Sequence, residues 1–246
     1  MTSELLMLLW GASSIAFIHT LLGPDHYLPF VAIGKARGWS LPRTAATTVF
    51  CGIGHSIGSI LLGFVGIYVG RALADLEMVE AFRGDMAAWA LLAFGLVYFV
   101  WGVRKSQTQK SHRHWHTHGD GTSHEHYHNH RKLHVHIHEA RQESISGKNK
   151  RMAFVTPWAL FIIFVLGPCE PLIPLMMIPA AQGQWMGVIL TVGVFTLVTI
   201  ATMTMVVVAA SLGLKTVSFD GLGKYAHALA GGTLSLCGLG MITLGL

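Results

Sequence analysis

Charged residues are scarce in this chain of 246 residues: Asp, Glu, Lys and Arg together make up 12% of it, about half of what is usual in a soluble domain. Hydrophobic residues make up 52%, and the mean hydropathy is +0.52. So few ionic side chains cannot coat a soluble surface of this size, which excludes an ordinary cytosolic enzyme and an intrinsically disordered chain. The composition instead predicts a protein embedded in a lipid bilayer, and we expect it not to be an enzyme.

Cysteine is also rare. The chain has only Cys51, Cys169 and Cys237, and three distant residues provide neither a disulfide framework nor a Cys-x-x-Cys pair for zinc or redox chemistry. The phosphate-binding sequence Gly-x-x-x-x-Gly-Lys-Ser/Thr is absent as well. We therefore expect no ATP hydrolysis in this chain and no prosthetic group.

The net charge of +5 and the pI near 9.3 arise from a single segment. Residues 104–151 hold ten of the 17 Lys and Arg and four of the 12 Asp and Glu, a local charge of +6, whereas the rest of the chain sums to −1. The basicity therefore belongs to one loop and does not indicate nucleic acid as a partner. The same segment holds 11 of the 15 histidines.

Apolar segments divide the rest of the chain into six candidate membrane spans, because a transmembrane helix needs about 20 predominantly apolar residues. The predicted spans are residues 5–22, 44–70, 86–103, 152–167, 185–214 and 225–246. The first span lacks the basic start and the cleavage site of a signal peptide. We therefore expect two three-helix membrane units, 1–103 and 152–246, joined by the His-rich loop 104–151.

The positive residues predict how the chain is oriented in the membrane. Lys and Arg collect in the first, third and fifth loops, which alternate along the chain and therefore share one face, whereas the second loop is net acidic. Because Lys- and Arg-rich short loops stay in the cytoplasm, the His-rich loop is predicted to be cytoplasmic and both termini outside. The protein is thus expected to be a multi-pass protein of the cell (inner or plasma) membrane.

Two similar segments indicate an internal repeat. Leu22-Gly-Pro-Asp-His-Tyr-Leu28 aligns with Leu166-Gly-Pro-Cys-Glu-Pro-Leu172 at an offset of 144 residues, and glycines near the end of each half align at an offset of 143. Because each half has three spans, the second half enters the membrane upside down relative to the first. Many secondary transporters are organised in this way. The alternative is chance similarity between helices rich in glycine and leucine.

Each repeat carries a Gly-Pro pair that should interrupt a helix, because proline lacks a backbone donor and clashes with the preceding turn. The apolar continuations, residues 27–34 and 171–181, are too short to cross the membrane again. Non-helical backbone at membrane depth is buried in protein or lines a wet cavity. The predicted fold is therefore all-α, with six transmembrane helices as two inverted three-helix repeats, and with a substrate site at the Gly-Pro breaks.

Ionisable residues surround the first break. His19 and His26 are seven residues apart, and the break would let Asp25 and His26 turn toward the helix face that carries His19. Imidazole with carboxylate suits Ni²⁺, Co²⁺ or Zn²⁺ better than the oxygen-preferring Mg²⁺ or Ca²⁺. The alternative is a helix cap, Asp25, with histidines that lie near lipid headgroups.

His55 lies near the middle of the second span, between Gly54 and Ser56. An ionisable residue within the membrane marks a functional site by default, since a buried polar group must find a partner. We therefore add His55 to the predicted metal pathway. A structural hydrogen bond between helices is the alternative interpretation.

The second break carries Cys169 and Glu170 at the positions equivalent to Asp25 and His26. Glu170 could balance the charge of a cation or gate protons, and Cys169 could serve as a soft ligand, although a lone membrane cysteine more commonly packs as a small apolar residue. Thr199 in the fifth span could supply a hydroxyl to the pathway, with a bond to its own helix as the alternative.

The loop histidines alternate with other residues in a polar, low-complexity segment, which predicts disorder in the absence of metal. Imidazoles at such short spacing bind Ni²⁺, Co²⁺, Cu²⁺ or Zn²⁺ weakly and exchangeably. A solvated spacer is the alternative. The weak loop ligands are His112, His114, His116, His118, His124, His126, His128, His130, His134, His136 and His138.

The motifs His19…Asp25-His26 and Gly54-His55-Ser56 resemble the signatures of the nickel/cobalt transporters, in particular the six-span NicO and UreH-like branch. A His-rich central loop is frequent in that family. The resemblance implies that His19, Asp25, His26 and His55 handle the transported metal. It also implies a metallochaperone or urease maturation proteins as cytoplasmic partners beside the lipid bilayer. One departure is that five residues separate His19 from the Asp-His pair, where larger members have four.

The segment that begins with Gly167 also resembles the Pro-Cys motif of CcdA-related membrane thiol-disulfide electron carriers. Such a carrier needs a thiol at the break in each repeat, so that a dithiol can pass two electrons. The first repeat has Asp25 at that position, which ranks electron transfer below metal transport. A non-transporting metal-binding accessory protein would explain the loop, but it would not explain two broken membrane helices.

Overall fold

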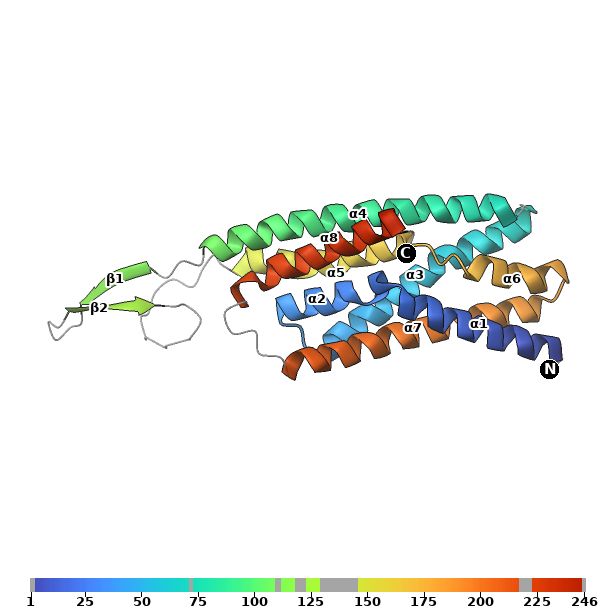
Figure 1. The fold of residues 1–246 in the computed structure, drawn as a ribbon, viewed down its shortest axis with the longest axis horizontal. Coiled ribbons are helices and arrows are strands. Elements are labelled where there is room, and N and C mark those ends of the chain that lie inside the picture. The colour runs from blue at the N-terminus through green and yellow to red at the C-terminus, as the bar shows by residue number, and fades with distance from the viewer. Residues whose placement is uncertain are drawn as a thin grey trace.

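The computed structural model describes residues 3–70, 73–108, 112–117, 123–128, 146–216 and 223–244. It is an elongated helical bundle in which most helices run along the long axis, with a small hairpin at one end (Figure 1). Five of the described helices are long and apolar enough to cross a membrane. The protein is therefore a membrane-embedded helical protein.

The first half of the chain is a long helix, a break, a short helix and two long helices. Its elements are α1 (Ser3–Leu22), the 3₁₀ turn η1 (Pro24–His26), α2 (Leu28–Arg37), α3 (Leu41–Val69) and α4 (Leu73–Thr108).

The second half repeats the order of the helices, although its 3₁₀ turn precedes the last helix and does not follow the break. It consists of α5 (Ser146–Leu166), α6 (Leu172–Ala181), α7 (Trp185–Thr216), the 3₁₀ turn η2 (Gly223–Tyr225) and α8 (Ala226–Leu244). The short helices α2 and α6 each have 10 residues and each follow a Gly-Pro pair. The predicted interruptions are thus present in both halves.

Five predicted spans correspond to the five long apolar helices, which are α1, α3, α4, α7 and α8. The predicted span 152–167 falls in α5, whose described apolar part, Thr156–Leu166, is shorter than a membrane span. The count of five therefore holds for the described residues, and the sixth span stays a prediction.

The first helix ends at Leu22 because Pro24, two residues later, has no backbone N–H to donate. The Gly23 N–H still donates to His19 O at 3.0 Å, the normal helical bond, and Pro24 has no N–H with which to continue. The chain then forms the turn η1, in which the His26 N–H donates to Gly23 O at 3.1 Å. This turn brings His26 back alongside α1, as the sequence predicted.

The third predicted span, 86–103, lies within a longer helix. α4 begins at Leu73, so the residues expected to form an acidic loop lie on its first turns. The charges there are compatible with a helix because Glu80 and Arg83 pair across one turn, with Arg83 Nη1 2.8 Å from Glu80 Oε1. Only residues 71 and 72 separate α4 from Gly70, the left-handed residue (φ 69°) that ends α3.

The described part of the His-rich loop contains a short hairpin, whereas the rest of the described structure is helical, as predicted. Residues His112–Thr117 (β1) and Ser123–His128 (β2) pair as an antiparallel hairpin. In its register, His112, His114 and His116 oppose His128, His126 and His124. Alternating patterns favour strands because successive residues of a strand face opposite sides, so the alternation that predicted disorder is also a strand pattern.

Helices α4 and α8 lie side by side and run in opposite directions (Figure 1). Gly102 lies against Ala228 near the hairpin end, whereas Gly238 lies against Leu92 farther along. Residue numbers that rise on one helix as they fall on the other define an antiparallel pair. Glycine at the crossing lets the two backbones approach closely.

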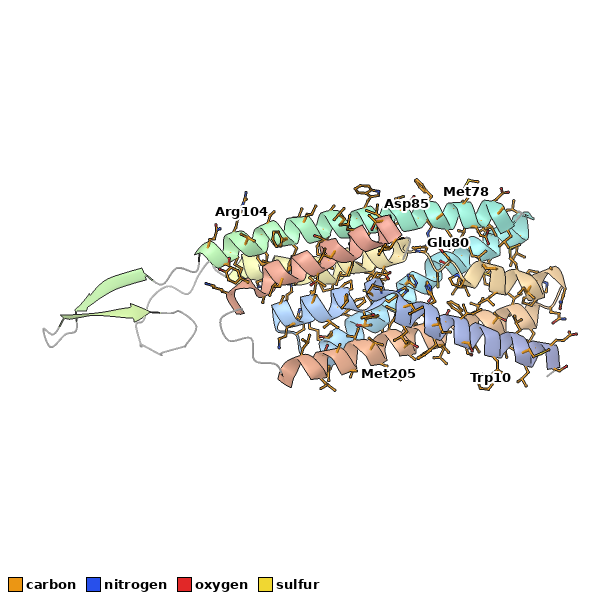
Figure 2. All side chains as sticks on the ribbon, viewed as in Figure 1. Trp10, Met78, Glu80, Asp85, Arg104 and Met205 are labelled. Atoms are coloured by element: carbon orange, nitrogen blue, oxygen red, sulfur yellow. The ribbon has the colours of Figure 1, made fainter. Side chains whose placement is uncertain are left out.

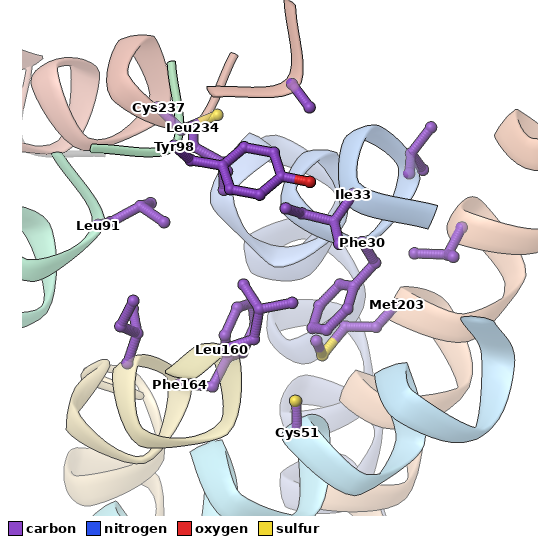
Figure 3. Close-up of a cluster of buried hydrophobic side chains, with 14 residues drawn as sticks. Phe30, Ile33, Cys51, Leu91, Tyr98, Leu160, Phe164, Met203, Leu234 and Cys237 are labelled. Atoms are coloured by element: carbon purple, nitrogen blue, oxygen red, sulfur yellow. The ribbon is translucent and has the colours of Figure 1, made fainter. Parts of the chain in front are cut away.

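Two clusters of buried apolar side chains hold the helices together. One joins α2, α3, α4, α5, α7 and α8, and includes Phe30, Leu160 and Met203 (Figure 3). The other joins α1, α6 and α7 around Met176 and Phe195. The core therefore ties elements of the first half to elements of the second.

Large apolar side chains also cover the outside of the bundle. Trp10, Met78 and Met205 are about two-thirds exposed or more, at 69%, 70% and 68% (Figure 2). A soluble monomer seldom exposes so much apolar surface. Lipid is the environment that such a surface fits.

Replacing Gly231 with alanine should destabilise the bundle. A Cβ at this position would lie 2.5 Å from Phe99 Cα and 2.8 Å from Gly95 O, so α4 and α8 would have to separate. Overpacking of this kind costs about 1–3 kcal/mol. Thermal unfolding of the purified protein in detergent measures the loss. The matched control is Gly193→Ala on α7, where nothing lies within 4 Å; equal melting temperatures of the two variants would contradict the prediction.

Candidate metal centre

Three histidines from three elements meet inside the bundle. His19 comes from the last turn of α1, His26 from η1 and His55 from the middle of α3. The His26 ring lies between the other two, with ring centroids 5.0 Å from His19 and 5.1 Å from His55. His26 and His55 are each only 3% exposed. The break after α1 is therefore what brings His26 into contact with both other rings.

The three Nε2 atoms have no hydrogen-bond partner. Each of them is buried, on His19, His26 and His55 alike. A buried polar atom without a partner costs about 1–3 kcal/mol, and three such atoms lie together here. Ligand atoms of the three side chains lie within 4.8 Å of one another. The cluster thus presents nitrogen acceptors toward a shared point without any protein donor to satisfy them.

The bonds of His26 fix which of its nitrogens is free. Nδ1 lies 3.2 Å from Gly23 O and 3.2 Å from Asp25 Oδ1, and both of these atoms are acceptors. Nδ1 therefore carries the proton and donates, which leaves Nε2 with its lone pair. A carboxylate or carbonyl behind a ligating histidine orients the ring and raises its basicity. Asp25 contacts His26 in this supporting position.

His55 is oriented by the second break. Its ring lies edge-on to the ring of Phe164 in the last turns of α5, with ring centroids 6.3 Å apart. A Cβ on Gly167 would lie 3.2 Å from His55 Nδ1, so a side chain there would crowd the ring. Both Gly-Pro breaks therefore contact the same cluster, one through His26 and one through His55.

A cavity of about 330 Å³ borders the cluster. His19, Asp25 and His26 line it, together with α4 residues and the second break at Pro168 and Glu170. A cavity needs about 10–15 Å³ to hold one water, so this cavity has room for several waters. A smaller cavity, of about 20 Å³, has Asp25 and His55 among its lining residues.

The other predicted pathway residues lie in different places. Glu170 is exposed and lines the 330 Å³ cavity. Cys169 is fully buried in the apolar cluster with Met176, and its backbone N–H donates to Ser59 Oγ at 3.1 Å. Thr199 is also fully buried, and its hydroxyl has no partner. The structure therefore brings Glu170 to the candidate site, and does not bring Cys169 or Thr199 into the histidine cluster.

The loop histidines are only partly described. Six of them lie in β1 and β2, where the described backbone gives their pairing. The other predicted loop ligands, His118, His130, His134, His136 and His138, lie outside the described residues.

A buried ion pair beside the second break was missed by sequence reasoning. Arg83 Nη2 donates to Val165 O at 2.8 Å and to Gly167 O at 3.4 Å, and Nη1 donates to Glu80 Oε1 at 2.8 Å. A cation at the end of α5 satisfies carbonyls that the helix leaves free. The sequence signal for this pair is the three-residue spacing of Glu80 and Arg83, because residues at that spacing lie on one face of a helix.

The spacing of the histidines is close to that of a metal site. When imidazoles bind one ion tetrahedrally at about 2.1 Å, their nitrogens are about 3.4 Å apart. Ligand atoms here lie within 4.8 Å of one another, so each ring would move by less than about 1 Å to reach a common ion. Imidazole ligands suit late first-row transition metals.

Comparisons of the chain with protein-family models, curated proteins and solved structures gave no match. The resemblance to nickel/cobalt transporters is thus an expectation that rests on the sequence motifs alone.

Proposed function

We propose that the protein is a multi-pass membrane transporter of divalent transition metal ions, most favourably Ni²⁺ or Co²⁺, with Zn²⁺ as a further substrate. The observation that carries the proposal is a cluster of three histidines at a broken helix: one ligand nitrogen of each lies within 4.8 Å of the others, and their buried Nε2 atoms have no hydrogen-bond partner. His19, His26 and His55 would replace part of the ion's hydration shell, and Asp25 would orient His26 and offset the positive charge. Glu170 would lie on the route of the ion.

We further propose that α5 is the sixth span and that the halves are inverted repeats. Two observations support this arrangement: both halves have the same order of helices around a Gly-Pro break, and α4 is antiparallel to α8, its equivalent in the second half. Transporters built in this way bind substrate at the interface of the repeats. The contact of both breaks with one histidine cluster fits that plan.

The proposed location is the cell (inner or plasma) membrane, with the His-rich loop in the cytoplasm and both termini outside. Inward movement of a 2+ ion then gains about 4.6 kcal/mol per 100 mV of membrane potential, twice the value for one charge. This gain favours import over efflux. A cytoplasmic metallochaperone or urease maturation proteins would receive the ion.

Deleting residues 112–138, which hold 11 histidines, should lower the rate or affinity of transport without abolishing it. The reason is that the proposed membrane site lies outside the loop, whereas the loop collects or buffers metal after passage. Uptake of radioactive nickel by vesicles that contain the shortened chain measures the effect. Complete loss of uptake by a folded protein would place the loop in the route itself.

Thiol-disulfide electron transfer fits the site less well. All three cysteines are free and buried, and Cys169 lies in a different apolar cluster from Cys51 and Cys237. A dithiol relay needs two thiols that can approach each other. A variant without cysteine should therefore retain metal flux.

The test of the proposed function is flux of radioactive nickel and cobalt in sealed vesicles of known orientation, with zinc as competitor. Metal should accumulate only when the protein is present, and the orientation then gives the direction. Vesicles with and without folded protein that take up metal equally would contradict the proposal.

A further inference from the structure

A second cavity adjoins the one beside the histidines. It has a volume of about 290 Å³ and is lined by Glu77, Glu80, Ala81, Glu170 and Ile173. Ala81 and Glu170 also line the 330 Å³ cavity that borders the histidines. The two spaces are therefore neighbours along the first turns of α4, and Glu170 stands between them.

The lining of the two cavities is strongly acidic. Glu77 and Glu80 line the 290 Å³ cavity, Asp85 lines the 330 Å³ cavity beside the histidines, and Glu170 lines both. Glu80 and Asp85 lie on the same stretch of α4 (Figure 2). Among the described residues that line either cavity there is no Lys or Arg. Arg83 offsets the charge of Glu80, so Glu77, Asp85 and Glu170 leave the lining of the two cavities net negative.

One carboxylate in this lining has an oxygen without any partner. Glu80 is 1% exposed, and its Oε2 forms no hydrogen bond, although Oε1 accepts from Arg83. The guanidinium of Arg83 is shared with Val165 O and Gly167 O. Burying a carboxylate oxygen without a partner is costly, and a cation in the cavity would relieve that cost.

We propose that these two cavities form an acidic vestibule through which a hydrated divalent metal cation passes between the α3–α4 side of the membrane and the histidine cluster. The volumes, about 290 and 330 Å³, leave room for an ion with its water shell, since each water takes about 30 Å³ of liquid. The carboxylates attract the hydrated ion, and the imidazoles strip its water. Glu170 is the one charged residue among the described residues that line both cavities, and so it lies where the two cavities of the vestibule meet.

The vestibule rests on the proposed function, because it needs a transported cation, but it predicts a separate property. A pocket lined by one sign of charge with low-dielectric walls raises the local concentration of the opposite ion by about 10–10³-fold. Salt screens this attraction, with a Debye length of about 10 Å at 0.1 M. The vestibule should therefore set the KM for metal and its dependence on salt, and not the maximal rate.

The test is Co²⁺ uptake by full-length protein in vesicles of uncharged phosphatidylcholine, measured at low and high ionic strength. The variant is the double substitution Glu170→Gln with Asp85→Asn. The matched control is Glu4→Gln, an exposed carboxylate at the start of α1 outside both cavities. At low salt the KM of the double variant should rise about three- to tenfold with an unchanged maximal rate, and high salt should remove the difference. Glu170→Asp keeps the charge and should keep the KM.

The outcomes separate the vestibule from the proposed function. A double variant whose KM and salt dependence match those of Glu4→Gln overturns the vestibule while wild-type uptake leaves the transporter intact. A fall in maximal rate with unchanged KM also overturns it, because the carboxylates would then act after the ion is bound. Absence of uptake by folded wild-type protein overturns both. The helical circular dichroism and the melting temperature in detergent report, for each variant, that the protein is folded.

Discussion

Replacing His55 with alanine will reduce metal flux at least about 100-fold, because an outer-shell group alone is worth about 10–100-fold in metal affinity and His55 is proposed as a direct ligand. The side chain is 3% exposed and offers an unpartnered Nε2 to the cluster. His26→Ala should have an effect of similar size, since its ring lies between the other two. Initial rates of nickel uptake by vesicles with equal amounts of folded protein measure both.

Two variants make this result specific. His227 lies at the start of α8, where Tyr98 Oη is 2.9 Å from its Nδ1 and Lys105 Nζ is 2.9 Å from its Nε2, so His227→Ala removes a histidine outside the cluster and should retain flux. Asp25→Asn keeps the shape of the side chain but loses the charge behind His26, and should weaken metal affinity by about 10–100-fold. Flux like that of the wild type in both His55→Ala and His26→Ala would exclude the cluster as the metal pathway.

Replacing Arg83 with methionine will destabilise the protein by about 3–5 kcal/mol, because it leaves a buried carboxylate without its partner. Glu80 is 1% exposed, and the carbonyls of Val165 and Gly167 at the end of α5 lose their donor as well. For a chain of this size such a loss lowers the melting temperature by about 6–20 °C. Thermal unfolding in detergent measures it.

The double variant Arg83→Met with Glu80→Gln should recover part of the lost stability, because no uncompensated charge remains. Arg43→Met is the control: Arg43 is exposed and lies over the Trp39 ring, 5.0 Å from its centroid, so its removal should have little effect. If Arg83→Met is as stable as Arg43→Met, the ion pair does not hold the second break in place.

The breaks could be predicted from the sequence because their cause is local. A proline after a glycine ends a helix wherever it stands, and Pro24 does so in the structure. The short helices α2 and α6 follow in the same way from apolar runs too short to span the membrane. Membrane embedding was equally accessible, since it follows from composition and the length of apolar segments.

Contacts between distant segments could not be derived from spacing. His55 is 29 residues from His26 in the chain, and only the packing of α3 against the first break brings the rings to 5.1 Å. The sequence predicted that His26 turns toward His19 and that His55 belongs to the same metal pathway, but its spacing could not give the contact between the His26 and His55 rings. Asp25 was predicted as a ligand, whereas its contact with His26 Nδ1 depends on how η1 turns.

The early start of α4 was not predicted, because the acidic residues before the third predicted span favour a loop over a membrane helix. Glu80 and Arg83 neutralise each other across one helical turn and lie buried against the second break. On a hydropathy scale each of these residues counts as polar, whether or not the two side chains pair. The hairpin in the His-rich loop was missed for a related reason, because alternation in a polar segment fits a strand as well as a disordered chain.

X-ray absorption of Ni²⁺ or Co²⁺ bound to the protein without residues 112–138 shows whether the three membrane histidines hold one metal ion. Removing that segment leaves His19, His26, His55 and His227 as the remaining histidines. We expect one bound ion per chain with three imidazole nitrogens at about 2.0–2.1 Å, and loss of the imidazole signal in His55→Ala but not in His227→Ala. An ion held only by oxygen, or a spectrum unchanged by His55→Ala, would contradict this expectation.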